Sequence, residues 1–359
     1  MSETILNSIS REMNIVRILL PRMIPDSHQR FQLIPSITKC KAYLTQYPLD
    51  SHMLEGTHIC VVVPARNEEE FIGNVLGNMP TFVDLVVVID DNSTDSTGQT
   101  AKTANVNCET IVIQGNGDGV GAAIDLGYRT AIQRFGDETF LCAVMAGDAQ
   151  MHPDDLISVC KPIIDNTADH VKGNRFLSPT IRRMPLQRRV ASRILSFGTS
   201  IASAMRIRDS QCGFTATRDS VLKSWNWENS WKSYGYPNYW IIECSKQFYR
   251  VKEVEVRAIY GDEVSGISPR KFFFTAFFIL FKYHHSRAFF WLRSNPNIFS
   301  LLSLMFYITG WLAIIYPLIS GLFLNGFQVI GLISWTISSC FDRAAKGYLS
   351  RKKSGRTRI

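Results

Sequence analysis

Runs of consecutive apolar residues alternate with polar or amphipathic segments over the first half of the chain. The apolar runs cover residues 59–63, 85–89, 111–113 and 140–145, and each stops at a polar or glycine-containing turn. Uninterrupted runs of this kind are typical of strands that a parallel sheet buries on both faces. Between them, the spacing of apolar residues predicts helices over 67–79 and from the glycine-rich stretch 115–121 to residue 132.

This order of strand, helix, strand and helix predicts an α/β fold with a Rossmann-like, mostly parallel sheet flanked by helices. Residues 170–270 are mixed, with a helix near 187–206, a turn at 209–214 and a strand near 251–258. Right-handed crossovers place the carboxyl ends of parallel strands at one edge of the sheet, where ligands bind. We therefore expect the functional site among the polar residues that follow the strands.

The C-terminal part of the chain has a different pattern. Residues 294–341 contain no Asp, Glu, Lys, Arg or His. The segment 298–324 is long enough to cross about 30 Å of hydrocarbon, and after a turn at Asn325-Gly326 the segment 327–341 can return. This predicts a transmembrane helical hairpin, with a buried core hairpin as the alternative. The apolar stretch 272–281 is too short to span and predicts an interfacial helix.

The distribution of charge along the chain predicts how this hairpin is oriented and how the chain is divided. The formal net charge is +8, and residues 342–359 hold seven basic residues against one acidic residue. A basic flank after an apolar span predicts a multi-pass protein of the inner or cell membrane with its catalytic domain in the cytoplasm. Because the rest of the chain is close to neutral, nucleic acid is disfavoured as a partner. The predicted divisions are an N-terminal extension (1–57), a catalytic domain (58–270), a juxtamembrane interfacial helix (271–293), two transmembrane helices (294–341) and a basic cytoplasmic tail (342–359).

Several classes of protein are disfavoured by motifs that the sequence lacks. The glycines of 115–121 follow the pattern G-x-G-x-G-x-G after the third strand, which is not the dinucleotide fingerprint after a first strand. The sequence has no phosphate loop of the G-x-x-x-x-G-K-[ST] type and no G-x-S-x-G nucleophile elbow. None of the eight cysteines forms a C-x-x-C pair, so a zinc or disulfide framework is not expected.

Asp90 and Asp91 follow the second apolar run directly. Two adjacent carboxylates at the end of a buried strand repel one another and need a cation or hydrogen-bond donors nearby. A ribose diol or a base N–H would serve. The alternative is that Asp90 caps the next helix while Asp91 is solvated.

Asp148, Ala149 and Gln150 follow the fourth apolar run. In an extended strand end, side chains two residues apart point the same way, so Asp148 and Gln150 can face one ligand. Oxygen ligands suit a hard divalent cation, and such a cation can neutralise a leaving diphosphate. His152 is either a further ligand or a structural hydrogen-bonding residue.

Basic residues gather in the next part of the chain. They are Lys172, Arg175, Arg182, Arg183, Arg188 and Arg189. Guanidinium groups bind phosphate in a bidentate manner, and beside a membrane the phosphate of an acceptor lipid is a candidate. The alternative is a solvated basic face that meets anionic headgroups.

Taken together, these motifs resemble the family 2 glycosyltransferases of GT-A fold, in particular the dolichol-phosphate-mannose-synthase-like branch that acts on polyprenyl phosphates. The resemblance covers about 58–270. It rests on the order and spacing of the motifs 64–68, 90–95, 119–123, 148–153, 173–176 and 209–214. Ala146 stands where the family pattern D-x-D-x-Q has its first Asp, and the Q-x-x-R-W motif of processive synthases is absent. The resemblance therefore implies a single transfer, with fewer metal ligands than usual.

The resemblance also implies roles for individual residues. The nucleotide sugar would be bound by Pro64, Ala65, Asn67, Glu68, Asp90, Asp91, Gly119 and Asp148. Asp148 and Gln150 would hold a divalent cation, Mg²⁺ or Mn²⁺. The acceptor phosphate would be held by Arg175, Arg188 and Arg189, and Asp148, Arg175 and Asp209 would act in catalysis.

The implied reaction is an inverting transfer of one sugar from a nucleotide sugar, such as UDP-glucose or GDP-mannose, to a membrane polyprenyl phosphate. Such a phosphate is already ionised at neutral pH, so no general base is needed. A sugar hydroxyl of a lipid-linked glycan would need one, and Asp209 is then the candidate. A non-catalytic membrane protein that binds nucleotide sugars is a further alternative, and a homo-oligomer is left open.

Overall fold

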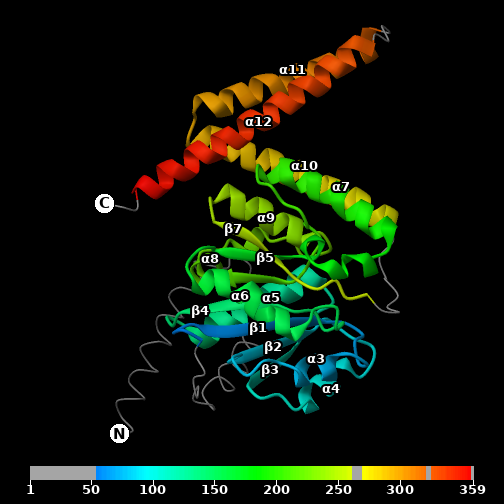
Figure 1. Cartoon of the computed structure of the whole chain (residues 1–359), viewed down its shortest axis with the longest axis vertical. Coiled ribbons are helices and arrows are strands. Elements are labelled where there is room, and N and C mark those ends of the chain that lie inside the picture. The colour runs from blue at the N-terminus through cyan, green and yellow to red at the C-terminus, as the bar shows by residue number, and fades with distance from the viewer. Residues whose placement is uncertain (1–53, 261–268, 321–324, 357–359) are drawn as a thin grey trace, which may run out of the picture. The chain divides into compact units, whose positions relative to one another are not determined.

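A computed structural model of the chain describes residues 54–260, 269–320 and 325–356. The predicted extension 1–57 lies outside the described residues except for its last four positions. At the centre of the described part is one seven-stranded sheet with the strand order β3-β2-β1-β4-β6-β5-β7 (Figure 1). Its strands are β1 (His58–Ala65), β2 (Leu85–Asp90), β3 (Glu109–Gln114), β4 (Phe140–Val144), β5 (His170–Asn174), β6 (Thr215–Arg218) and β7 (Val251–Glu255).

The sheet is mostly parallel, as the sequence predicts. β1, β2, β3 and β4 run in parallel, β5 and β7 are parallel to each other, and β6 is antiparallel to both of its neighbours. Every residue of β1, β2 and β4 is buried, which explains why these strands read as continuous apolar runs. The register pairs Ala65 with Asp90 and Asp90 with Gln114, so the carboxyl ends of three strands lie level.

Helices cover both faces of the sheet. On one face, α3 (Ile72–Gly77), α4 (Thr97–Thr103) and α6 (Leu156–Ile164) share one hydrophobic core with the alternate residues Ile59, Val61 and Val63 of β1. On the other face lies α5 (Val120–Phe135), where a Cβ added to Gly127 would stand 2.3 Å from Cγ1 of Val62. The remaining helices around the sheet are α8 (Asp219–Lys223) and α9 (Tyr236–Lys246). Four short 3-10 turns complete it: η1 (Pro153–Asp155), η2 (Arg175–Leu177), η3 (Pro179–Arg183) and η4 (Trp227–Asn229).

Two long helices run beside each other next to this domain, α7 (Leu186–Ser203) and α10 (Pro269–Ser294) (Figure 1). They are followed by α11 (Ile298–Ser320) and α12 (Asn325–Arg356), which pack as an antiparallel pair. The hydroxyls of Ser303 and Ser338 bond across this pair, and a Cβ on Gly310 would meet the ring of Trp335. Of the helices that the structure describes, one contains a segment long and apolar enough to cross a membrane, Ile298–Pro317 in α11.

Several elements differ from the expectation. Helix α3 begins at Ile72 and not near residue 67, because the preceding turn is tied to the loop after β2. Helix α10 covers the predicted juxtamembrane helix 271–293 and so extends beyond the apolar stretch 272–281, and the predicted boundary at residue 341 falls inside the continuous helix α12. Helix α7 ends early, at the left-handed residue Ala204. Strands β5 and β6 contain the buried polar residues Lys172 and Thr217, so neither reads as an apolar run.

Candidate functional site

The turn after β1 and the loop after β2 are joined by direct hydrogen bonds. Ser93 Oγ accepts from the backbone N–H of Asn67 at 3.0 Å, and the Asn67 side-chain oxygen accepts from the N–H of Thr94 at 2.8 Å. The N–H of Glu68 donates to Thr97 Oγ1 at 2.7 Å. Asn67 has a φ of 56°, a left-handed conformation that asparagine tolerates better than most residues. Predicted nucleotide-site residues from two strand ends are thus brought together.

Asp91 holds the glycine-rich loop. Its carboxylate is buried, with Oδ1 2.9 Å from the N–H of Gly117 and Oδ2 3.0 Å from the N–H of Gly119. Its own N–H donates to the carbonyl of Ala65 at 2.8 Å. We expected hydrogen-bond donors near this carboxylate, and the structure shows that they include backbone amides of the chain itself. Asp91 thereby fixes the glycine-rich loop after β3 relative to the end of β1.

Asp90 has a local structural role in its turn. Its Oδ1 accepts from the N–H of Ser93 at 3.0 Å, and it is 5% exposed. A Cβ on Gly98, in the first turn of α4, would stand 2.5 Å from Asp90 Oδ2. The two adjacent acids are thus oriented into different loops.

The glycines after β3 are required by close packing. Gly119 has a φ of 105°, and a Cβ there would stand 2.9 Å from the carbonyl oxygen of Lys232. At Gly121 an added Cβ would stand 2.3 Å from the carbonyl oxygen of Trp231. The N–H of Ala122 donates to the Lys232 carbonyl at 3.0 Å. This loop is therefore fixed between Asp91 and the segment before α9.

The end of β4 joins the same edge. The N–H of Gly147 donates to the carbonyl of Pro64 at 3.1 Å, so Asp148 follows a contact with β1 directly. Asp148 is partly exposed, and its Oδ1 accepts from the N–H of Gln150 at 3.0 Å across the left-handed residue Ala149. His152 accepts from the N–H of Asp154 through Nδ1 at 3.2 Å and caps η1, which supports its structural role.

The donor set at this strand end fits a divalent cation only in part. Among the residues that the structure describes, no three His, Cys, Asp or Glu side chains come together as a metal site. Asp148 and Gln150 offer a carboxylate and an amide oxygen. Mg²⁺ is commonly bound by one or two carboxylates together with phosphates of the substrate. The pair is therefore compatible with a cation that a diphosphate brings with it.

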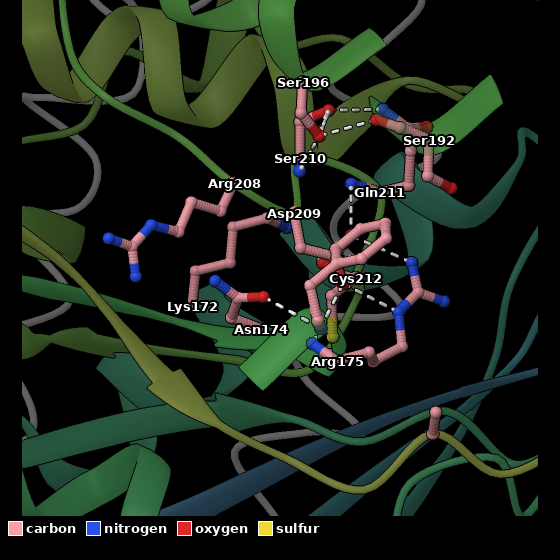
Figure 2. A network of polar contacts seen from close by, with 12 residues as sticks. Lys172, Asn174, Arg175, Ser192, Ser196, Arg208, Asp209, Ser210, Gln211 and Cys212 are labelled. Atoms are coloured by element: carbon pink, nitrogen blue, oxygen red, sulfur yellow. Dashed lines mark hydrogen bonds and ion pairs between the residues drawn. The ribbon is translucent and has the colours of Figure 1, made fainter. Parts of the chain in front are cut away.

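A second group of residues lies at the ends of β5 and of the turn before β6 (Figure 2). The Arg175 guanidinium faces the Asp209 carboxylate as a fork, with Nε 2.8 Å from Oδ2 and Nη2 2.9 Å from Oδ1. The N–H of Arg175 also donates to Oδ2, at 3.1 Å. Asp209 is fully buried, and two parallel charge-assisted bonds of this kind are among the strong hydrogen bonds in proteins.

Burial alone would raise the pKa of Asp209, but the hydrogen bonds and charge of Arg175 hold this pKa below its ordinary value. A carboxylate that is both weakly basic and engaged by a guanidinium is a poor proton acceptor. Beside it, Lys172 is fully buried in β5, and its ammonium donates to the carbonyl of Cys212. Burial lowers the pKa of Lys172.

Tyr260 links this ion pair to α7. Its hydroxyl accepts from Arg175 Nη1 at 2.9 Å, and the Arg188 guanidinium lies over its ring, 5.7 Å from the centroid. Arg188 is exposed. Arg189 instead bonds the Met184 carbonyl through Nη2 at 2.9 Å, at the start of α7. The structure thus brings Arg175, Asp209 and Arg188 together and directs Arg189 to a turn.

Tyr260 and two groups that hold the Asp209 turn were not predicted from the sequence. Glu253 of β7 accepts from the N–H groups of Arg208 and Asp209 at 2.9 Å. Ser196 of α7 accepts from the N–H of Ser210 at 2.9 Å. Tyr260 lies shortly after the end of β7, so the rule that led to the other residues, polar side chains after strands, could have found it. The two anchors carry no such signal.

The two groups are connected through Met151. Its sulfur accepts from the N–H of Ala146 at 3.3 Å, and its methyl carbon would be 3.1 Å from a Cβ on Gly213. Ala146 and Asp148 therefore lie between the nucleotide-site residues predicted after β1 and β2 and the Arg175–Asp209 pair. Acidic groups, backbone amides and guanidinium groups therefore lie along one edge of the sheet.

Comparisons with known proteins agree with this arrangement. The sequence profile of glycosyl transferase family 2 matches residues 60–225. The UDP-N-acetylglucosamine–dolichyl-phosphate N-acetylglucosaminyltransferase of Methanococcus voltae is 30% identical over 220 residues, which are 57% of this chain and 86% of that protein. An uncharacterised protein of Methanocaldococcus jannaschii is 31% identical over 227 residues, which are 62% of this chain and 90% of that protein.

A solved structure with a similar arrangement is the glucosyl-3-phosphoglycerate synthase of Mycobacterium tuberculosis, with a TM-score of 0.47 at 16% identity. The matched region covers 67% of this chain and 84% of the synthase chain. This similarity is too distant to assign a ligand or a metal. The matched profile and the two archaeal relatives decide the assignment. They confirm the resemblance inferred from the motifs, and the chain is a glycosyltransferase of family 2.

Proposed function

We propose that this glycosyltransferase transfers one sugar, with inversion, from a nucleotide sugar to the phosphate of a membrane polyprenol. The named Methanococcus relative uses UDP-N-acetylglucosamine and dolichyl phosphate, so this donor stands beside UDP-glucose and GDP-mannose as the first to test. The observation that carries the proposal is that the Asp209 carboxylate is engaged by Arg175 and has a lowered pKa.

Asp209 is the side chain that a hydroxyl acceptor would need as a base. Both of its oxygens are engaged by Arg175, and its pKa is lowered. An ionised phosphate oxygen needs no deprotonation before it attacks the anomeric carbon, so a site whose candidate base is engaged by an arginine suits it. This favours a lipid phosphate over a sugar hydroxyl as the acceptor.

Arg188 is the residue that we assign to the acceptor phosphate. In Arg175 the three guanidinium nitrogens already contact Asp209 and Tyr260, whereas Arg188 is exposed and rests on the Tyr260 ring. Arg175 then acts as a positioning residue, since it fixes Tyr260 and through it Arg188. Arg189 supports the same helix start through Met184.

The surface beside Arg188 suits a lipid. Along α7 the exposed apolar residues Leu186, Val190, Ile194 and Phe197 recur at helical spacing. The neighbouring α10 exposes Phe273, Phe274, Phe277, Phe278 and Phe281. A basic and apolar surface of this kind is typical of helices that lie at a membrane interface. In our proposal α11 spans the membrane, α12 returns, and the catalytic domain is cytoplasmic.

On the donor side, we propose that the nucleoside is bound between the turn at 64–68 and the loops held by Asp90, Asp91 and Gly119. Asp148 and Gln150 would hold Mg²⁺ or Mn²⁺ together with the diphosphate. When bound, the cation would supply positive charge to the leaving group. The residues of the chain itself would orient the two substrates.

The proposal is tested with the full-length protein in membranes, using radiolabelled UDP-N-acetylglucosamine, UDP-glucose and GDP-mannose with dolichyl or undecaprenyl phosphate. We expect one donor to give a lipid product that mild acid cleaves. Arg188→Gln should raise the KM for the lipid phosphate more than the KM for the donor. Exposed Arg129→Gln, on α5, serves as the control variant. Label found only in an acid-stable glycan would contradict the lipid-phosphate acceptor.

A further inference from the structure

A cavity of about 580 Å³ lies between α7, the turn that follows it and α12. Four arginines line it, Arg193, Arg206, Arg208 and Arg343. No acidic residue is among its lining residues. The cavity shares no arginine with the set assigned to the acceptor phosphate.

These four arginines differ from the arginines that form ion pairs elsewhere in the described residues. Arg134, Arg218 and Arg250 each pair with a carboxylate at 3.6 Å or less. Within the part of the chain that the structure describes, no ion pair to a carboxylate is found for the four cavity arginines. Like charges around one cavity repel one another, and a bound anion would offset this cost.

The backbone that carries two of them is firmly held. Ser200 Oγ accepts from the N–H of Ile207 at 3.0 Å, and Ser196 Oγ accepts from the N–H of Ser210 at 2.9 Å. The N–H of Arg208 donates to Glu253 at 2.9 Å, and in Figure 2 its guanidinium points away from that of Arg175. The turn is thus fixed by α7 and β7, while the charged end of Arg208 is left for the cavity.

Arg343 enters the cavity from α12, which a buried ion pair holds in place. The neighbouring Asp342 is 2.6 Å from Nη2 of Arg287 on α10, and Arg287 Nε donates to the carbonyl of Ala202 at the end of α7. The three helices that surround this corner are therefore joined. The backbone positions that carry the exposed cavity arginines are thus held before a ligand binds, which lowers the cost of ordering the helices around it.

The walls of the cavity are partly apolar. Phe176, Phe197 and Ile207 complete the lining with Ser196 and Ser200. Phe197 is 67% exposed and belongs to the apolar stripe of α7 that includes Ile194. Arg343 follows the uncharged segment that ends at residue 341. The cavity thus combines guanidinium groups with an apolar border beside the predicted membrane segments.

From this combination we propose that the cavity binds the phosphate headgroup of a membrane phospholipid. The guanidinium groups would bind the phosphate oxygens, and Phe197 with the α7 stripe would contact the acyl chains. The site is separate from the acceptor phosphate site at Arg188, and the proposal holds whichever sugar and acceptor the enzyme uses. A bound headgroup would fasten α7 and α12 to the bilayer surface.

The test uses the full-length protein in an uncharged detergent and native mass spectrometry. The probes are dioctanoyl phosphatidic acid, dioctanoylglycerol without phosphate, and inorganic phosphate. We expect one phosphatidic acid per protein, weaker binding of inorganic phosphate, and none of dioctanoylglycerol. The double variants Arg206→Gln/Arg343→Gln and Arg193→Gln/Arg208→Gln should each weaken phosphatidic acid binding by about tenfold or more.

Lys102→Gln/Lys252→Gln removes the same charge from exposed positions on α4 and β7 and should leave binding unchanged. Equal weakening in this control, or no weakening in either arginine variant, would overturn the proposal. So would inorganic phosphate binding as tightly as phosphatidic acid, because the apolar border would then contribute nothing. Stoichiometric displacement of phosphatidic acid by undecaprenyl phosphate, with loss of transfer in the arginine variants, would identify the cavity as the acceptor site instead.

Discussion

Arg175 and Asp209 are paired fork to fork, 2.8 Å and 2.9 Å apart, with the carboxylate fully buried. Removing one member of such a pair leaves a buried charge without its partner. We expect Asp209→Asn to lower the free energy of unfolding by about 3–5 kcal/mol. Replacing both residues by apolar ones, Arg175→Met with Asp209→Leu, should recover most of that loss. Denaturant unfolding checks this, and a double variant no more stable than Asp209→Asn would contradict it.

The same pair gives a pH dependence. Because the folded pKa of Asp209 is lowered despite burial, its stabilisation is present above the ordinary carboxyl pKa. It is lost as the pH falls through the lowered value, below about pH 4. We expect unfolding measured from pH 3 to pH 6 to show a smaller acid-side decrease in Asp209→Asn than in the wild type.

Asp91 should matter for donor binding through the glycine loop that it holds. In Asp91→Asn one oxygen remains, so one of the bonds to Gly117 and Gly119 is lost and the negative charge is removed. Each such charge-assisted bond contributes about 1.5–3 kcal/mol. We expect the Kd for UDP or GDP to rise by at least about tenfold while the Kd for the lipid phosphate changes little. Calorimetry measures both, and equal weakening of both would argue for a general loss of structure.

Asp125 on α5 predicts a pH dependence of the opposite sign. Burial raises its pKa to about 6, although the Tyr236 hydroxyl donates to Oδ1. A carboxyl whose folded pKa is raised costs stability once the pH rises above its unfolded value. We expect Asp125→Asn to gain about 1–3 kcal/mol relative to the wild type between pH 4 and pH 7.

Exposed Asp137→Asn is the matched control for this comparison, and its stability difference from the wild type should stay constant over that range. A constant difference for Asp125→Asn as well would show that the folded Asp125 titrates normally. Urea unfolding at several pH values measures both variants.

Ala146→Asp restores the acid that the family pattern has at this position. If Asp148 and Gln150 hold a cation with the diphosphate, a second carboxylate two residues away should strengthen Mn²⁺ binding in the presence of UDP by about tenfold or more. Electron paramagnetic resonance of Mn²⁺ reports this without any turnover. Ala146→Asn keeps a similar size without the charge and should have a smaller effect. Unchanged Mn²⁺ affinity in Ala146→Asp would place the cation elsewhere.

The strands on the donor side could be predicted from the sequence because full burial leaves no polar position in them. β1, β2 and β4 are buried along their whole length, and their ends could be located from the polar residues that follow. The same reasoning failed for β5 and β6, where Lys172 donates to the Cys212 carbonyl and Thr217 Oγ1 bonds His170 inside the core. Polar groups that are satisfied internally remove the apolar signal.

The sequence predicts where the candidate site residues gather better than it predicts the contacts among them. Adjacent acids at 90 and 91 indicated a need for donors, but only the structure identifies Gly117 and Gly119 as donors to Asp91. Pairing across long separations, such as Arg175 with Tyr260, has no counterpart in local sequence. The site roles themselves remain predictions for the experiments above.

The continuous helix α12 has a consequence for the proposed use of a lipid acceptor. It runs from its packing against α11 to Asp342, which is fixed to Arg287 and through it to Ala202. With α11 in the bilayer, this joint would prevent the sheet from pivoting and would act as a spacer whose length is set at about 1.5 Å per residue. The proposed acceptor phosphate would then have to be reached at a fixed height above the membrane.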